Sequence, residues 1–149
     1  MFRFCALKAS LRTAALIACT LSPTLQATAA EDEDGYLLVK EGQTVIVQPL
    51  ALVFTQKADL KAYQDFYQGH FTHHEAEAYN AQIQLAGKAL ELKQAAIATV
   101  LCQDQATHEV QVQIEGTDPE WVDGGKLEPY SLQRMKAYLD WKELIEPGS

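Results

Sequence analysis

The residues with the clearest ligand character stand together between positions 70 and 77. His70, His73 and His74 are followed by Glu77, and imidazole and carboxylate are side chains that bind zinc. His70 and His74 are four residues apart, and His74 and Glu77 are three apart, so on a continuous helix some of them would share a face. Metal binding by these four residues is therefore one hypothesis.

The same stretch also contains signals that end one helix and begin another. Gly69 is placed to end a helix, and Thr72 with Glu75 forms the Thr-x-x-Glu pattern of a capping box. The break falls between His70 and His73, whereas a zinc site needs three or four ligands in a rigid frame. We therefore favour a solvated turn whose charge depends on pH, and we expect no cofactor.

Motifs typical of catalysis do not occur in the sequence. It has no Gly-x-Ser-x-Gly, no phosphate-binding loop, no glycine-rich dinucleotide turn and no Cys-x-x-Cys. Paired acidic residues are frequent, but none lies in a recognisable pocket motif. The sequence therefore predicts a protein that is not an enzyme.

Residues 1–29 have the composition of a secretion signal. Three basic residues precede a short apolar run, and Ala27-Thr28-Ala29 has the small-residue pattern of a cleavage site. The run is shorter than the roughly 20 residues that cross a bilayer, so we expect no stable membrane span. The sequence thus predicts a periplasmic or secreted protein with one exported domain over residues 30–149.

A second processing site is present within the signal. Leu16-Ile17-Ala18-Cys19 resembles a bacterial lipobox, in which the cysteine is acylated and becomes the first mature residue. A lipoprotein anchored at Cys19 is therefore the alternative. We favour cleavage after Ala29, because that site has the proper small residues.

The charge of the remaining chain is strongly negative. Without residues 1–29 it carries nine Lys and Arg against 20 Asp and Glu, a formal net charge of −11. Such a surface repels nucleic acid and anionic lipid. Nucleic acid is therefore excluded as a partner, and either simple solubility or a basic partner explains the charge.

Apolar spacing predicts a helical hairpin over residues 56–87. Tyr63, Phe66 and Tyr67 recur at helical spacing before Gly69, and a second stripe that includes Tyr79 follows the capping box. These aromatic side chains could line a ligand groove, with Tyr63 and Tyr67 as contacts. At helical spacing they more often belong to a core.

Strand patterns flank this hairpin on both sides. Residues 110–114 alternate Val, Gln, Val, Gln and Ile, which is typical of a half-buried strand. Upstream, the turn signal at Gly42 predicts that residues 36–40 and 44–47 form a β-hairpin. Residues 88–96 are compatible with helix or strand, and we expect a strand from about Ile97.

The segment from Gly116 to Gly125 has the composition of a loop. Trp121 would then be either a lid on the core or an interface anchor. As an anchor it would form a binding surface with the nearby carboxylates of Asp118, Glu120 and Asp123. Ser131 is a good N-cap, so a C-terminal helix should follow it.

The apolar strands occur in an order that resembles bacterial SH3-like domains. The matching segments are Gly42 to Val47, residues 98–101, residues 109–114, Glu120-Trp121-Val122 and Leu127. With the stretches between them, the resemblance covers about half of the mature chain. The resemblance implies an α+β protein with a small antiparallel β-barrel or sheet, into which the helical hairpin is inserted.

The resemblance also implies binding of peptides or cell-wall material without catalysis. The predicted function is a non-enzymatic accessory module of the bacterial envelope with a protein or cell-wall partner. Two alternatives stay open. One is an acidic periplasmic inhibitor or immunity-type protein, and the other is a metal-binding protein that uses the turn from His70 to Glu77.

Overall fold

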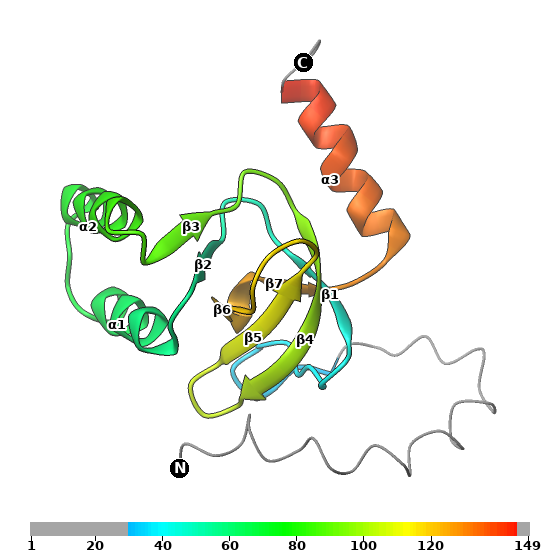
Figure 1. Cartoon of the computed structure of the whole chain (residues 1–149), viewed down its shortest axis with the longest axis horizontal. Helices are drawn as coiled ribbons and strands as arrows, with labels where there is room; N and C mark the ends of the chain where they lie inside the picture. The colour runs from blue at the N-terminus through cyan, green and yellow to red at the C-terminus, as the bar shows by residue number, and fades with distance from the viewer. Residues whose placement is uncertain (1–29, 146–149) are drawn as a thin grey trace.

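The protein is built on one antiparallel sheet with three helices around it (Figure 1). The computed structural model describes residues 30–145, with side chains to residue 140. The predicted signal and the anchor at Cys19 lie outside the described residues. The α+β class, the antiparallel sheet and the two helical predictions are confirmed.

Seven strands form the sheet in the order β3-β2-β6-β5-β4-β1-β7. A 3-10 helix, η2, separates the last two strands along the chain. The strands and η2 span β1 Thr44–Val47, β2 Leu52–Phe54, β3 Ala89–Glu91, β4 Ala96–Asp104, β5 Glu109–Ile114, β6 Glu120–Asp123, η2 Gly124–Lys126 and β7 Leu127–Pro129.

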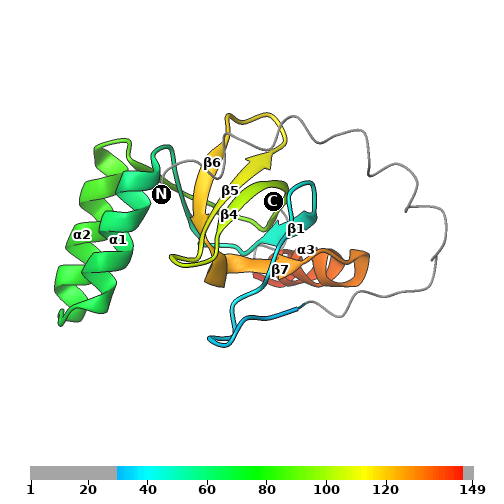
Figure 2. The same cartoon turned by 90° about the horizontal axis from the view of Figure 1, so that it is seen from below.

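The helical hairpin consists of α1 (Lys57–Gln68) and α2 (His73–Leu85), and it stands to one side of the sheet (Figure 2). It leaves the sheet after β2 and returns in β3, and these two strands pair with each other. The predicted capping box is formed, because Thr72 and Glu75 each accept a hydrogen bond from the backbone of the other. Gly69 has extended backbone angles rather than the left-handed ones expected of a helix-ending glycine.

The C-terminal helix α3 (Leu132–Ile145) points away from the sheet (Figure 1). The Ser131 side chain accepts a hydrogen bond from the backbone of Arg134, as expected of an N-cap. Between residues 30 and 145, no helix is long and apolar enough to cross a membrane.

Two apolar clusters hold the domain together. The larger one lies on one face of the sheet and includes Val100, Val110, Val112 and Val122, all without exposed surface. The second joins the other side of the sheet to the helical hairpin through Phe54 and Leu60. The alternation predicted for β5 is confirmed, because its valines enter the first cluster.

The predicted β-hairpin over residues 36–47 is wrong. Strand β1 pairs with β4 and β7, and residues 36–40 form no strand. Leu37 and Val39 are nevertheless buried in the larger cluster. The side-chain amide of Gln103 bonds the backbone of both residues, so a side chain takes the place of a neighbouring strand.

The predicted loop over residues 116–125 is also wrong at its centre. Residues 120–123 form β6, which pairs with β5 and with Phe54 of β2. The strand forms because buried Val122 alternates with the half-buried Trp121. In the sequence this short alternation is hard to see, because Gly and Pro residues stand on both sides of it. The open choice at residues 88–96 is decided in favour of strand, because β3 occupies positions 89–91 and β4 begins at Ala96.

Candidate functional site

A cleft of about 340 Å³ lies where α1, the β4–β5 turn and η2 meet. Its walls combine aromatic, amide and charged side chains from segments that are distant in sequence. The lining residues are Tyr36, Leu52, Phe54, Tyr63, Gln64, Tyr67, Gln68, Thr107, His108, Asp123 and Lys126.

The helical wall of the cleft is formed by two tyrosines one turn apart on α1. The ring centroids of Tyr63 and Tyr67 are 4.6 Å apart, and the Tyr67 hydroxyl donates a 2.9 Å hydrogen bond to Asn80 of α2. Burial raises the pKa of Tyr63 to about 12. Tyr63 therefore presents a neutral phenol at physiological pH.

The opposite wall is formed by Tyr36 and His108, whose rings stack at 3.7 Å between centroids. His108 has a φ of 57°, a left-handed conformation that is uncommon outside glycine. Its carbonyl accepts a 2.7 Å hydrogen bond from the backbone of Gly124. The β4–β5 turn is thus fixed to η2 on one side and to the N-terminal segment on the other.

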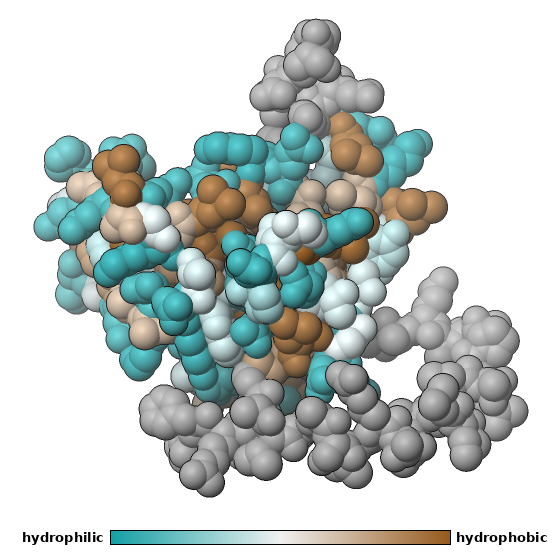
Figure 3. Space-filling view, viewed as in Figure 1, coloured by the Kyte–Doolittle hydropathy of each residue, from teal (hydrophilic) through white to brown (hydrophobic). Residues whose placement is uncertain are grey.

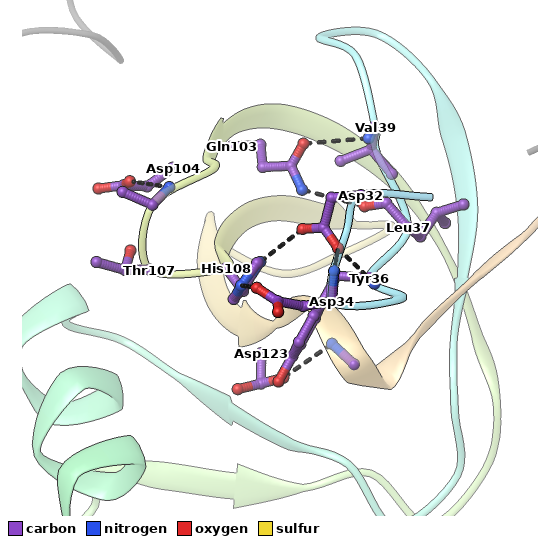
Figure 4. Close-up of polar contacts among 12 residues, drawn as sticks. Asp32, Asp34, Tyr36, Leu37, Val39, Gln103, Asp104, Thr107, His108 and Asp123 are labelled. Atoms are coloured by element: carbon purple, nitrogen blue, oxygen red, sulfur yellow. Dashed lines mark hydrogen bonds and ion pairs between the residues drawn. The ribbon is translucent and has the colours of Figure 1, made fainter. Parts of the chain in front are cut away.

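Two carboxylates flank the His108 imidazole (Figure 4). Nδ1 lies 3.2 Å from Asp32, and Nε2 lies 3.6 Å from Asp34. Among residues 30–140, these three side chains are the one group of possible metal ligands whose donor atoms lie within 4.8 Å of one another. Each ring nitrogen faces a carboxylate, and the buried Nδ1 makes no hydrogen bond of regular geometry.

Asp123 lies below these residues and is held by neutral donors. One carboxylate oxygen accepts a 2.8 Å hydrogen bond from the side-chain amide of Gln64. The other accepts a 2.8 Å hydrogen bond from the backbone N–H of Gly125. The Asp123 charge is the largest cause of the raised pKa of Tyr36, ahead of burial. The negative charge of Asp123 therefore acts within the cleft.

The cleft brings together three of the residues predicted to bind a partner, namely Tyr63, Tyr67 and Asp123. Trp121 lies beside them in the cluster around Phe54, with the Lys57 ammonium 5.3 Å from its ring centroid.

The other two predicted residues lie elsewhere. Successive residues of a strand point to opposite faces, so Glu120 faces away from Trp121. Asp118 is exposed in the preceding loop and contributes, after burial, to the raised pKa of Glu120. The predicted surface around Trp121 is thus divided between two faces of the sheet.

The histidines of the hairpin turn do not form a compact ligand set. His70, His73 and His74 are all exposed. His73 lies 3.1 Å from Glu77, one helical turn further along α2. The group of possible metal ligands found among the described residues, Asp32, Asp34 and His108, does not include any residue of this turn.

No pattern in the sequence points to Tyr36, Asp32 or Gln64 as a site residue. Tyr36 was assigned to a strand, and His108 stands in a turn without any local motif. Their convergence depends on tertiary contacts, so no spacing in the sequence signals it.

The comparisons with known proteins add no assignment. No protein-family model matches the chain, and no curated protein or solved structure matches it significantly.

Proposed function

We propose that this chain is an exported, non-enzymatic binding protein of the bacterial envelope, and that the cleft beside α1 is its binding site. The observation that carries the proposal is the convergence of Tyr36, Tyr63 and Asp123 on one open cleft. A concave site with aromatic walls and a few fixed polar groups is the usual form of a binding site.

An SH3-like barrel is the architecture that we propose for the binding module. In support, β7, β1, β4, β5 and β6 are consecutive neighbours in the sheet, and the last strand returns to pair with the first. A bulge between Val100 and Cys102 allows the long strand β4 to bend, as closure of a small barrel requires. The helical hairpin, between β2 and β3, then belongs to the long connection from β1 to β4.

The character of one face of the molecule fits the choice of the cleft as the site. On the face seen in Figure 3, hydrophilic side chains separate small hydrophobic patches. Scattered apolar residues of this kind need no functional explanation. A cleft built from five separate segments does call for one.

An acidic inhibitor that blocks a basic cleft of another protein is the second candidate. The formal charge of −11 on residues 30–149 favours it, because complementary charge accelerates association. This candidate differs from the first in its surface, since an inhibitor would use exposed carboxylates rather than its own cleft.

Blocking the cleft tests the first candidate. Thr107 is exposed at the cleft, and its recorded contact there is made by its backbone carbonyl, so Thr107→Arg should fill the opening without disturbing the fold. Gln105→Arg adds the same charge two residues away, outside the cleft. The immobilised mature chain and both variants would be exposed to envelope extract and to purified peptidoglycan.

We expect Thr107→Arg to abolish capture and Gln105→Arg to preserve it. Capture that is indifferent to Thr107→Arg would exclude the cleft as the binding site. Equal loss with both variants would indicate that the added positive charge matters rather than the cleft, and would favour the acidic-inhibitor candidate.

A further inference from the structure

We propose that the cleft receives a lysine or arginine side chain of a partner polypeptide, with Asp123 as its counter-ion and Tyr36 and Tyr63 beside its aliphatic stem. This inference rests on the proposed function and specifies the ligand of the same site.

Asp123 is oriented by its neighbours but not neutralised by them. Its two hydrogen-bond donors, the Gln64 amide and the backbone of Gly125, carry no net charge. None of the ion pairs recorded among the described residues includes Asp123. A carboxylate that is fixed in position by neutral donors is prepared for a cation, because little reorganisation is needed on binding.

The negative potential extends across the cleft from wall to wall. Asp123 is the largest cause of the raised pKa of Tyr36, with Asp34 and Asp32 contributing after burial. Tyr63, on the helical wall, also has a raised pKa to which Asp123 contributes, although burial and Tyr67 act more strongly. The same carboxylate thus acts on a tyrosine of each wall, and it lines the cleft together with them.

The basic groups around the cleft leave this potential largely in place. Lys57 is engaged with Asp104 and Glu109 at 2.9 and 3.3 Å. His108, even when protonated, stands between two carboxylates. Lys126 lines the cleft and is exposed, where solvent screens its charge.

The rest of the lining suits a long basic side chain rather than a compact ion. Leu52 and Phe54 close the cleft behind the tyrosines and are themselves buried, so the apolar surface is that of the tyrosine rings. Lysine and arginine bury their aliphatic stems on such surfaces while the charged head stays polar. Aromatic faces also attract the cationic head directly.

Two model peptides would test this inference by NMR titration of the 15N-labelled mature chain. The probes are acetyl-Gly-Lys-Gly-amide and acetyl-Gly-Gln-Gly-amide, which differ in charge at one position. We expect the lysine peptide to shift the signals of Gly125 and of the Gln64 side-chain amide. It should bind about tenfold more tightly than the glutamine peptide, because a hydrogen bond between charged groups contributes more than one with a neutral amide.

Asp123→Asn should weaken the lysine peptide about tenfold, because it removes the charge but keeps an acceptor for Gly125. Asp65→Asn is the matched control. Asp65 is exposed on α1 and paired with Lys61, so its loss changes the net charge equally without altering the cleft. Binding of the lysine peptide should be unchanged in this variant.

The outcomes separate this inference from the function on which it rests. Equal binding of both peptides, or indifference to Asp123→Asn, would overturn the cationic ligand. If Thr107→Arg still abolished partner capture, the cleft would remain the binding site for a ligand of another class. If capture were indifferent to Thr107→Arg as well, both proposals would fail.

Discussion

Lys57, the first residue of α1, lies over a carboxylate that is almost completely withdrawn from solvent. Its ammonium is 3.3 Å from Glu109, whose side chain is 1% exposed, and 2.9 Å from Asp104. Burial acts to lower the pKa of Lys57, but its contacts with the carboxylates of Asp104 and Glu109 outweigh burial and the pKa is raised. This contact joins the helical hairpin to the β4–β5 hairpin.

Lys57→Met should destabilise the fold, because it leaves the Glu109 charge buried without a partner. Removing one member of a buried pair costs several kcal/mol, and we expect a loss of about 3 kcal/mol in the free energy of unfolding. The double variant Lys57→Met/Glu109→Gln should recover most of that loss. Urea melts of the two single variants and the double variant would measure the coupling.

Lys61→Met provides the control for this cycle. Lys61 lies one turn further along α1 and pairs with the exposed Asp65, so its melting curve should match that of the unmodified protein. If both lysine variants lost the same stability, the Glu109 pair would have no special structural role.

Trp121 should act as part of the core. It packs against the buried cluster that contains Phe54 and Leu60, between the sheet and the hairpin. Trp121→Ala should therefore lower the free energy of unfolding by about 3 kcal/mol. Trp121→Phe should retain most of the stability. An unchanged melt of Trp121→Ala, combined with loss of partner capture, would instead identify Trp121 as an interface anchor.

Glu75 should stabilise α2 in a pH-dependent manner. The backbone N–H and then the hydroxyl of Thr72 donate to its carboxylate and lower its pKa. A carboxylate with a lowered pKa in the folded state stabilises the fold above its unfolded pKa. That contribution is lost as the pH falls through the lower, folded pKa.

Glu75→Gln should therefore lower the melting temperature at pH 7, and the difference should shrink as the pH falls below 4.5, the ordinary value for this group. Thermal melts between pH 3 and 7 would measure it. Glu115→Gln, at an exposed position, is the control and should show no such trend. A difference between Glu75→Gln and the unmodified protein that is constant with pH would contradict the capping role.

Export should produce a mature chain that begins near Ala30. The small-residue pattern before it predicts this site, and Cys19→Ala should then leave the mass of the mature chain unchanged. Intact-mass measurement after expression with the full signal would decide it. An acylated chain that begins at Cys19 would establish the lipoprotein alternative.

Local chemistry made part of the fold predictable. The capping box at Thr72 and Glu75 identifies the start of α2 because both of its partners lie within one turn. The alternation of Val110, Val112 and Ile114 identifies β5 for a similar reason, since a period of two needs no knowledge of the neighbouring strand. Both predictions depend on residues that are close in sequence.

Partner choice could not be predicted in the same way. Residues 36–40 have the apolar composition of a strand, yet the backbone of Leu37 and Val39 is bonded by Gln103, more than 60 residues away. Trp121 stands among residues typical of a loop, yet it joins the sheet because Val122 fills the core.

The cleft, too, depends on contacts between residues that are distant in sequence. The side chains of Tyr36, His108 and Asp123 meet through tertiary packing. Of the predicted binding residues, Tyr63 and Tyr67 were identified from helical spacing and Asp123 from its proximity to Trp121. Their common location could not be inferred from either pattern.

The position of β1 has a consequence for the order in which the chain folds. Its partners are residues 96–99 of β4 and residues 127–129 of β7, so both sides of β1 remain unpaired until most of the chain has been synthesised. During that time the apolar run of Val45, Ile46 and Val47, which is fully buried in the native protein, is available to other molecules. Non-local pairing of this kind slows folding and prolongs exposure to aggregation. The β1 segment is therefore where a chaperone would protect the nascent protein most effectively.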